Sequence, residues 1–220
     1  MPDRRRRLIA TLFATMLVAA VLPSSAWAGA YEDILAAAHR NDTETVADFI
    51  RRGMDVNTSD RSGTSLLMIA AGNGNEQLLE TLLRNRANIL KKNKYGDSAI
   101  TLAALKGHLP VLRRLIEQGG AERINDPGWG ALHYASFGGH ADTVRFLISM
   151  KASLNAMAPN GQTALILATR NGHLEVVRLL VDAGADVNLA DSGGNSALKT
   201  AQKSNHSEIA DFLKKSGAVD

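Results

Sequence analysis

The segment Asn-Gly-His-Leu-Glu-Val-Val-Arg-Leu-Leu at residues 171–180 occurs in two altered copies elsewhere in the chain. The copies are Lys-Gly-His-Leu-Pro-Val-Leu-Arg-Arg-Leu at 106–115 and Gly-Gly-His-Ala-Asp-Thr-Val-Arg-Phe-Leu at 138–147. Glycine, or asparagine in its place, recurs in phase with steps of 33 residues and one step of 32, at Asn41, Gly74, Gly107, Gly139, Gly172 and Asn205. A second series with the same period runs through Gly63, Gly96, Gly128, Gly161 and Gly194. Two series that share one period indicate an internal repeat.

Each period contains the pattern of two short helices, which is clearest between residues 163 and 194. The first predicted helix spans Thr163–Arg170 with Thr163 as its N-cap, and it stops at Gly172, because glycine tolerates the positive φ that follows a helix end. The second begins near Leu174 and ends at Gly184. The polar, glycine-rich stretch 185–194 predicts a tight turn. Two short antiparallel helices cannot bury their apolar faces alone, so we expect the units to stack.

The motifs of these units resemble those of a known repeat family. Gly-Gln-Thr-Ala-Leu-Ile-Leu-Ala at 161–168 stands where that family has G-x-T-P-L-H-x-A, and Gly-Trp-Gly-Ala-Leu-His-Tyr-Ala at 128–135 keeps the histidine. Asn-Gly-His-Leu-Glu-Val-Val at 171–177 matches x-G-H-x-E-V-V, and Ala-Gly-Ala-Asp-Val-Asn at 183–188 matches x-G-A-D-V-N. From residue 29 onward, the chain therefore resembles the ankyrin repeat family.

This resemblance implies an all-α repeat solenoid, in which each unit is a helix–turn–helix followed by a hairpin-like turn. The period gives six units, at about 30–60, 61–93, 94–125, 126–158, 159–191 and 192–218. The family's proline at the start of the first helix is replaced throughout, by Leu66, Ala99, Ala131, Ala164 and Ala197. Each helix thereby loses some preorganisation, but we expect the fold to survive. The join from Gly119 to Gly128 is one residue short, so we expect an irregular turn there.

The first 28 residues have the three-part pattern of a secretory signal peptide. Four arginines, Arg4 to Arg7, precede an uncharged apolar run from Leu8 to Leu22, and Ala26-Trp27-Ala28 provides a cleavage signal. Fifteen residues of helix reach roughly 22 Å, which is short of the ~30 Å hydrocarbon core, although an uncleaved membrane anchor is the alternative. We expect cleavage after Ala28, leaving one ankyrin repeat domain at 29–220 with no membrane span. The short signal indicates the bacterial periplasm, with full secretion as the alternative and export by the general or the twin-arginine route left open.

Composition excludes several classes of function. The 220 residues include no cysteine, which excludes a disulfide scaffold, a thiol nucleophile and a cysteine-based metal site. The net charge of +3 comes from the arginines of the predicted signal peptide, and the rest of the chain is neutral overall. A nucleic-acid binder normally carries a basic stripe on its folded domain, so DNA and RNA are not expected partners.

The histidines do not form a metal or acid–base site in this repeat. His108, His140, His173 and His206 occupy the same repeat position, and neighbouring helices pack about 8–10 Å apart, too far for shared ligation. We expect each ring to hydrogen-bond to backbone between units, and we expect His133 to be structural and His39 to be exposed. Signature motifs of hydrolases, metalloproteases and P-loops are absent. The sequence therefore predicts no catalytic, cofactor-binding or metal-binding residues and no enzyme, with an unrecognised catalytic site as the alternative.

The resemblance implies recognition of partners through the turn tips and the exposed side of each first helix. The residues that we expect to contact a partner are Arg61, Lys94, Tyr95, Asp97, Lys106, Trp129, Phe137 and Arg170. Binding hot spots favour Trp, Tyr and Arg, so the aromatic residues of the middle units are the centre of this prediction. The alternative is that Trp129 or Phe137 fills a gap at the short join.

The predicted function is that of a non-enzymatic module that binds a folded partner protein. By family analogy the partner is a periplasmic enzyme. The alternative is a secreted effector that docks on a host protein, and a further possibility is a self-associating structural module. We expect a monomer.

Overall fold

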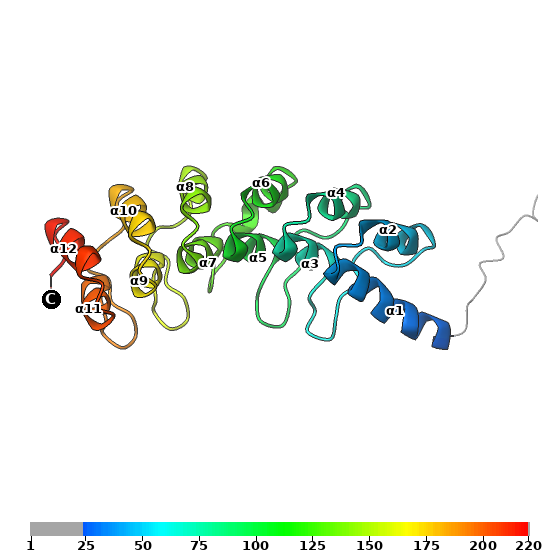
Figure 1. Cartoon of the computed structure of the whole chain (residues 1–220), viewed down its shortest axis with the longest axis horizontal. Coiled ribbons are helices and arrows are strands. Elements are labelled where there is room, and N and C mark those ends of the chain that lie inside the picture. The colour runs from blue at the N-terminus through cyan, green and yellow to red at the C-terminus, as the bar shows by residue number, and fades with distance from the viewer. Residues whose placement is uncertain (1–23, 220) are drawn as a thin grey trace, which may run out of the picture.

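The computed structural model describes residues 24–219, which form short α-helices joined by tight turns. Helices alternate between two rows that run the length of the molecule (Figure 1). The first-helix row contains α1 (Ser24–His39), α3 (Leu66–Asn73), α5 (Ala99–Lys106), α7 (Ala131–Gly138), α9 (Ala164–Arg170) and α11 (Ala197–Lys203). The second-helix row contains α2 (Thr43–Arg51), α4 (Glu76–Arg84), α6 (Leu109–Glu117), α8 (Ala141–Ser149), α10 (Leu174–Asp182) and α12 (Ser207–Lys215).

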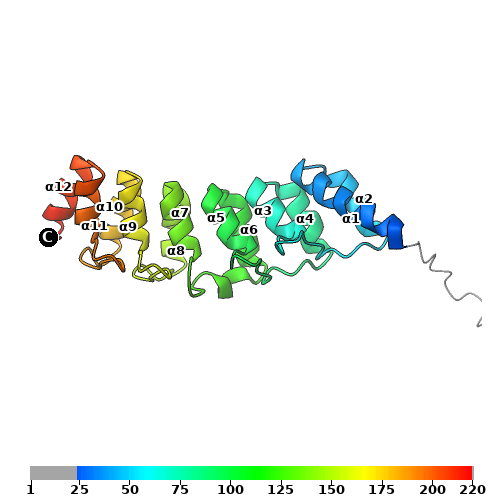
Figure 2. The same cartoon turned by 90° about the horizontal axis from the view of Figure 1, so that it is seen from below.

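Successive units stack side by side into an elongated solenoid (Figure 2). Each first helix packs on the next, α3 on α5, α5 on α7 and α7 on α9, while α8 packs on α10 in the other row. The turns between units project beyond the first-helix row (Figure 1), where antiparallel bridges pair Ser59 with Ser65 and Ala190 with Ser196. The predicted all-α repeat solenoid with hairpin-like turns is therefore confirmed for the described residues.

Side-chain N-caps start four of the first helices, α3, α5, α9 and α11. The N-caps Ser65, Ser98, Thr163 and Ser196 each accept the backbone N–H of the residue three positions later, and for Thr163 the distance to the nitrogen of Ile166 is 3.3 Å. These bonds satisfy one of the free N–H groups of the first turn. The prediction that the helices tolerate the loss of proline is consistent with this capping.

The repeated glycines and histidines fit together between units. Gly74 and Gly139 have φ of 70° and 74°, and a Cβ on either would lie 2.6 Å from the Nδ1 atom of His108 or His173 of the following unit. The Nε2 atoms of His140, His173 and His206 lie 2.9, 3.0 and 3.2 Å from carbonyl oxygens of the preceding unit. The predicted structural role of these three histidines is confirmed, because each joins two units.

The short join between the third and fourth units is irregular, as predicted. A 3₁₀ helix spans Gly120–Arg123. Arg123 donates to the carbonyl oxygen of Leu90 at 2.8 Å and pairs with Asp126, which also pairs with Lys92 at 2.7 Å. These charged contacts stabilise the irregular join, which stands where the other units have a regular turn.

One continuous apolar core lies between the two rows. Leu78, Leu112, Leu147 and Leu180 of the second-helix row are fully buried, as is Leu165 of the first, which is 1% exposed. The core extends through every unit, so neighbouring units stabilise each other.

The predicted signal peptide lies outside the described residues, except for residues 24–28 at the start of α1, and it stays a prediction. Among the helices of residues 24–219, none has both the length and the apolar character that crossing a membrane requires.

Candidate functional site

The turn tips are held by a repeated side-chain device. Asp60 Oδ1 accepts the backbone N–H groups of Ser62 and Thr64, at 2.9 and 2.8 Å. Asn93 in the next unit, and Asp191 further along, use one oxygen in the same way. Partial burial raises the pKa of Asp60, but these N–H donors and the Ser62 hydroxyl outweigh it and hold that pKa below its usual value. The tips are therefore ordered before any partner arrives.

An aromatic pocket opens on the first-helix row between the third and fifth units. Its apolar lining consists of Leu105, Trp129, Tyr134, Phe137 and Leu167, and its polar lining consists of Asn160, Gln162 and Arg170. The cavity volume is about 420 Å³. This volume lies in the range of roughly 300–1,000 Å³ that is usual for binding pockets.

The rings of this aromatic pocket are positioned by α7 and by the turn before it. Trp129 lies 6.0 Å from Tyr134 between ring centroids, and 6.0 Å from His133 in an edge-to-face arrangement. The Tyr134 hydroxyl donates to Asp97 Oδ1 at 2.8 Å. Burial, together with this bond to the carboxylate, raises the pKa of Tyr134 far above its ordinary value. The phenol is thus a fixed neutral group rather than an acid–base group.

Histidine 133 supports the pocket from behind. It is 2% exposed, its Nδ1 accepts the N–H of Gly130 at 3.2 Å, and its Nε2 lies 3.0 Å from the carbonyl oxygen of Ala156. Gly130 has no side chain that could cap the first turn of α7, so the one side-chain bond at this helix start is the bond from the Gly130 N–H to the His133 ring. Burial lowers the pKa of His133, although bonds to backbone oppose the shift. The predicted structural role of His133 is confirmed, and His39 is exposed as predicted.

Three of the eight predicted contact residues, Trp129, Phe137 and Arg170, line the aromatic pocket. Lys106 follows the lining residue Leu105 directly at the end of α5 and is exposed. Phe137 is 46% exposed, so it does not fill a gap in the core, whereas Trp129 packs on two neighbouring rings and also borders the cavity.

The other four predicted residues lie outside the aromatic pocket, on the tips of the second and third units. Arg61, Lys94 and Tyr95 are exposed, and Tyr95 is exposed by 78%. Asp97 is half-buried, and its carboxylate accepts hydrogen bonds from Tyr134 and from the Asn93 side chain. It positions Tyr134 and is not a free acceptor on the surface.

Comparison with known proteins agrees with this architecture. A family model described as ankyrin repeats (three copies) matches residues 34–126, 67–158 and 132–220. The chain belongs to the ankyrin repeat family. Members of this family generally serve as non-enzymatic interaction folds.

Several animal proteins are similar to this chain. The human Notch-regulated ankyrin repeat-containing protein is 38% identical over 85 residues, which cover 36% of this chain and 75% of that protein. A homolog of transient receptor potential cation channel subfamily A member 1 from Caenorhabditis elegans is 30% identical over 105 residues, or 48% of this chain and 9% of that protein. Inversin of Danio rerio is 35% identical over 79 residues, which cover 35% of this chain and 8% of that protein. The similarity supports the repeat fold.

Five residues of the aromatic pocket are not among the eight predicted contact residues: Leu105, Tyr134, Asn160, Gln162 and Leu167. Tyr134 and Leu167 each lie three residues before a predicted one, Phe137 and Arg170 respectively. Residues three apart share one face of a helix, so this spacing is the signal that would have found them.

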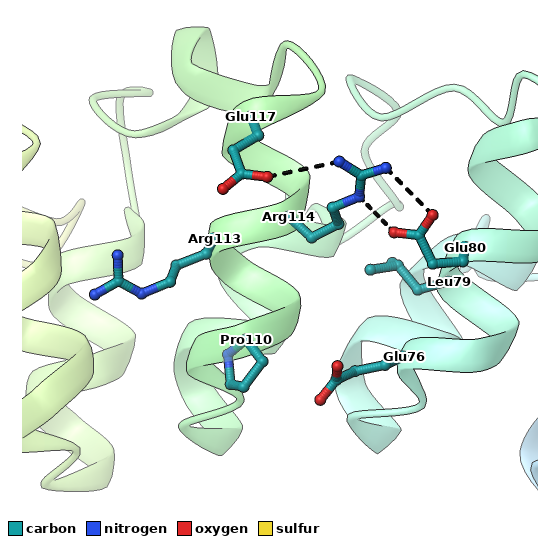
Figure 3. A pocket seen from close by; sticks show the side chains of 7 residues that line it. All are labelled: Glu76, Leu79, Glu80, Pro110, Arg113, Arg114 and Glu117. Carbon is teal, nitrogen blue, oxygen red and sulfur yellow. Dashed lines mark hydrogen bonds and ion pairs between the residues drawn. The ribbon is translucent and has the colours of Figure 1, made fainter.

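A second pocket lies between α4 and α6 of the ankyrin units, on the second-helix row (Figure 3). It has a volume of about 210 Å³ and is lined largely by charged side chains. Arg114 pairs with Glu80 of the neighbouring unit and with Glu117 of its own helix. Three of its charged groups therefore satisfy one another, and the Arg113 guanidinium lies 4.2 Å from the centroid of the Phe146 ring. Across residues 24–219, no group of three or more His, Asp or Glu side chains is arranged to hold a metal ion.

Proposed function

We propose that this ankyrin repeat protein is a non-enzymatic binding module that docks a partner protein on its first-helix row. The observation that carries the proposal is the aromatic pocket, where Trp129, Tyr134 and Phe137 border one cavity beside Arg170. Aromatic and arginine side chains that cluster in a concave site are typical of binding hot spots.

The rigidity of the site favours this function. The tips are held by Asx-type hydrogen bonds, and neighbouring tips are joined by the bonds from Lys94 N–H to Ser62 and from Ser192 N–H to Asn160. Little conformational entropy is lost when a preformed surface binds, so a modest contact area suffices.

We further propose that the module is exported to the bacterial periplasm and acts there as a monomer. The support is the pattern of residues 1–28, with its arginines, apolar run and Ala-x-Ala site. A periplasmic enzyme is the proposed partner, and a secreted effector that docks on a host protein is the alternative. Cell fractionation distinguishes the two, because accumulation of the shortened chain in the medium without lysis markers favours the effector.

The test of binding is affinity capture from the compartment that contains the chain. The wild type, Phe137→Ala and Met150→Ala are compared as bait, because Phe137 lines the pocket and Met150 is an exposed apolar residue at the end of α8, in the second-helix row. We expect one protein to be enriched by the wild type and by Met150→Ala and lost with Phe137→Ala. Equal capture by all three baits contradicts a pocket-centred site.

A further inference from the structure

The two helix rows differ in charge. In α3, α5, α7, α9 and α11 there is no Asp or Glu, but there are four cations, Lys106, Arg170, Lys199 and Lys203. Every helix of the second row contains at least one acid. Although the net charge of the repeat domain is zero, its first-helix row therefore has a basic face from α3 to α11.

Two acids in the turns beside this basic face, Asp97 and Asp191, already accept hydrogen bonds from the chain, although these bonds do not cancel their negative charge. Asp97 accepts from the Tyr134 hydroxyl, and Asp191 accepts the N–H groups of Gly193 and Asn195. Arg170 lies 3.8 Å from Asp191, which is long for a hydrogen bond, and its side chain is 43% exposed. Lys106 is exposed and has no acidic partner among residues 24–219. Lys106 is therefore free to bind an anion, and the exposed guanidinium of Arg170 keeps N–H donors that its one long contact with Asp191 does not use.

Other ligand chemistries fit the same residues less well. An aromatic cluster can bind a cation over its rings, but Arg170 in the lining opposes a second positive charge. Single-stranded nucleic acid needs aromatic rings spaced along a groove, one for each stacked base. Here the rings come only from α7 and from the turn before it, so they form one anchor site.

We infer that the partner presents an acidic peptide segment with one large apolar side chain. The apolar side chain enters the aromatic pocket, and the carboxylates that flank it pair with Lys106 and Arg170. This inference rests on the proposed function and specifies the chemistry of the partner. Complementary charge beside a desolvated apolar anchor adds specificity and speeds association.

The test is selection of random dodecapeptides displayed on phage, with the chain as bait. We expect enrichment of Asp or Glu within about three positions of Leu, Phe or Trp, the reach of neighbouring side chains along an extended peptide. A synthetic copy of the selected peptide should bind roughly three- to tenfold more weakly to Arg170→Ala and to Lys106→Ala. Arg145→Ala, which changes an exposed cation of the second-helix row, is the matched control and should bind like the wild type.

Enrichment of Lys and Arg, an apolar motif without acids, or no enrichment overturns the inference. Equal losses with Arg145→Ala and Arg170→Ala, or binding of an oligothymidine in place of peptides, also overturn it. The proposed function fails separately, when affinity capture does not depend on Phe137. A partner captured through Phe137 whose docking segment lacks acids would leave the function standing and contradict the inference alone.

Discussion

The two helix rows of this solenoid differ in how far their charged and aromatic side chains are paired within the chain. In the second-helix row, acids and arginines alternate and pair between units, as in Arg145 with Glu175 and Arg178 with Glu208. In the first-helix row from α3 to α11, cations occur without acids, and Phe137 remains 46% exposed. The second row pairs several of its charges between units, while the first row leaves cations and aromatic surface uncovered. Such a difference indicates which face is available to a partner.

The largest expected effect is a loss of stability when the apolar core between the two rows is disrupted. Leu165→Ala removes a side chain that is 1% exposed in the core between the rows. We expect the free energy of unfolding to fall by roughly 2–5 kcal/mol, because a cavity remains where the leucine packed. Urea denaturation followed by circular dichroism measures it. A loss near zero would mean that the assigned repeat register is wrong.

The next largest effect is expected on partner affinity, when the exposed Phe137 of the first-helix row is replaced. Phe137→Ala should weaken binding of the captured partner by about tenfold or more, as expected for a hot-spot aromatic. The free energy of unfolding should change far less, since the ring is partly exposed. Titration calorimetry makes the comparison, with Met150→Ala of the second-helix row as the control variant. A loss of stability as large as the loss of binding would assign Phe137 to the core.

A smaller effect is expected on the pH dependence of stability, and it tests His133, which supports the aromatic pocket. Burial lowers the pKa of His133 below its ordinary 6.5. The unfolded chain therefore binds this proton more readily, so stability is complete above about pH 6.5 and falls as the pH decreases below it. The slope is at most about 1.4 kcal/mol per pH unit for one proton. In His133→Leu, the free energy of unfolding should change less between pH 7.5 and 5, and an unchanged slope would refute the assignment.

The smallest effect is expected in the second-helix row. Arg145 pairs with Asp142 and with Glu175, and its side chain is 55% exposed. Exposed ion pairs contribute about 0–1 kcal/mol, so Arg145→Ala should barely change the unfolding midpoint. Partner affinity should not change at all, in contrast to Arg170→Ala. Equal effects of the two substitutions on affinity would remove the distinction between the rows.

Much of this fold could be predicted from the sequence, because its determinants repeat. The N-cap at Thr163, the glycine that follows α9 and the histidines between units are local features, and each occurs in several copies. The short join was predicted only as an irregular turn. Its 3₁₀ helix depends on Arg123 reaching Leu90 in the preceding unit, a contact that no local pattern encodes.

The candidate site was predicted only in part, because residue type and repeat position can be read from the sequence but contacts between distant residues cannot. Trp129, Phe137 and Arg170 were found from residue type and repeat position, and they do line one cavity. Asp97 was predicted as a contact residue, but it is held by Tyr134, which is 37 residues away in the sequence. Whether a tip residue is free or engaged depends on such distant partners, so it could be read only from the structure.

Docking of the partner on the first-helix row is tested most directly by photocrosslinking in living cells from one position in each row. A photoreactive amino acid replaces Phe137 in the first-helix row, or Arg145 in the second, and adducts are identified by mass spectrometry. Both positions are exposed, so reagent access does not favour either. We expect a single dominant protein adduct from position 137 and none from position 145. The same adducts from both positions, or adducts from position 145 alone, would contradict it.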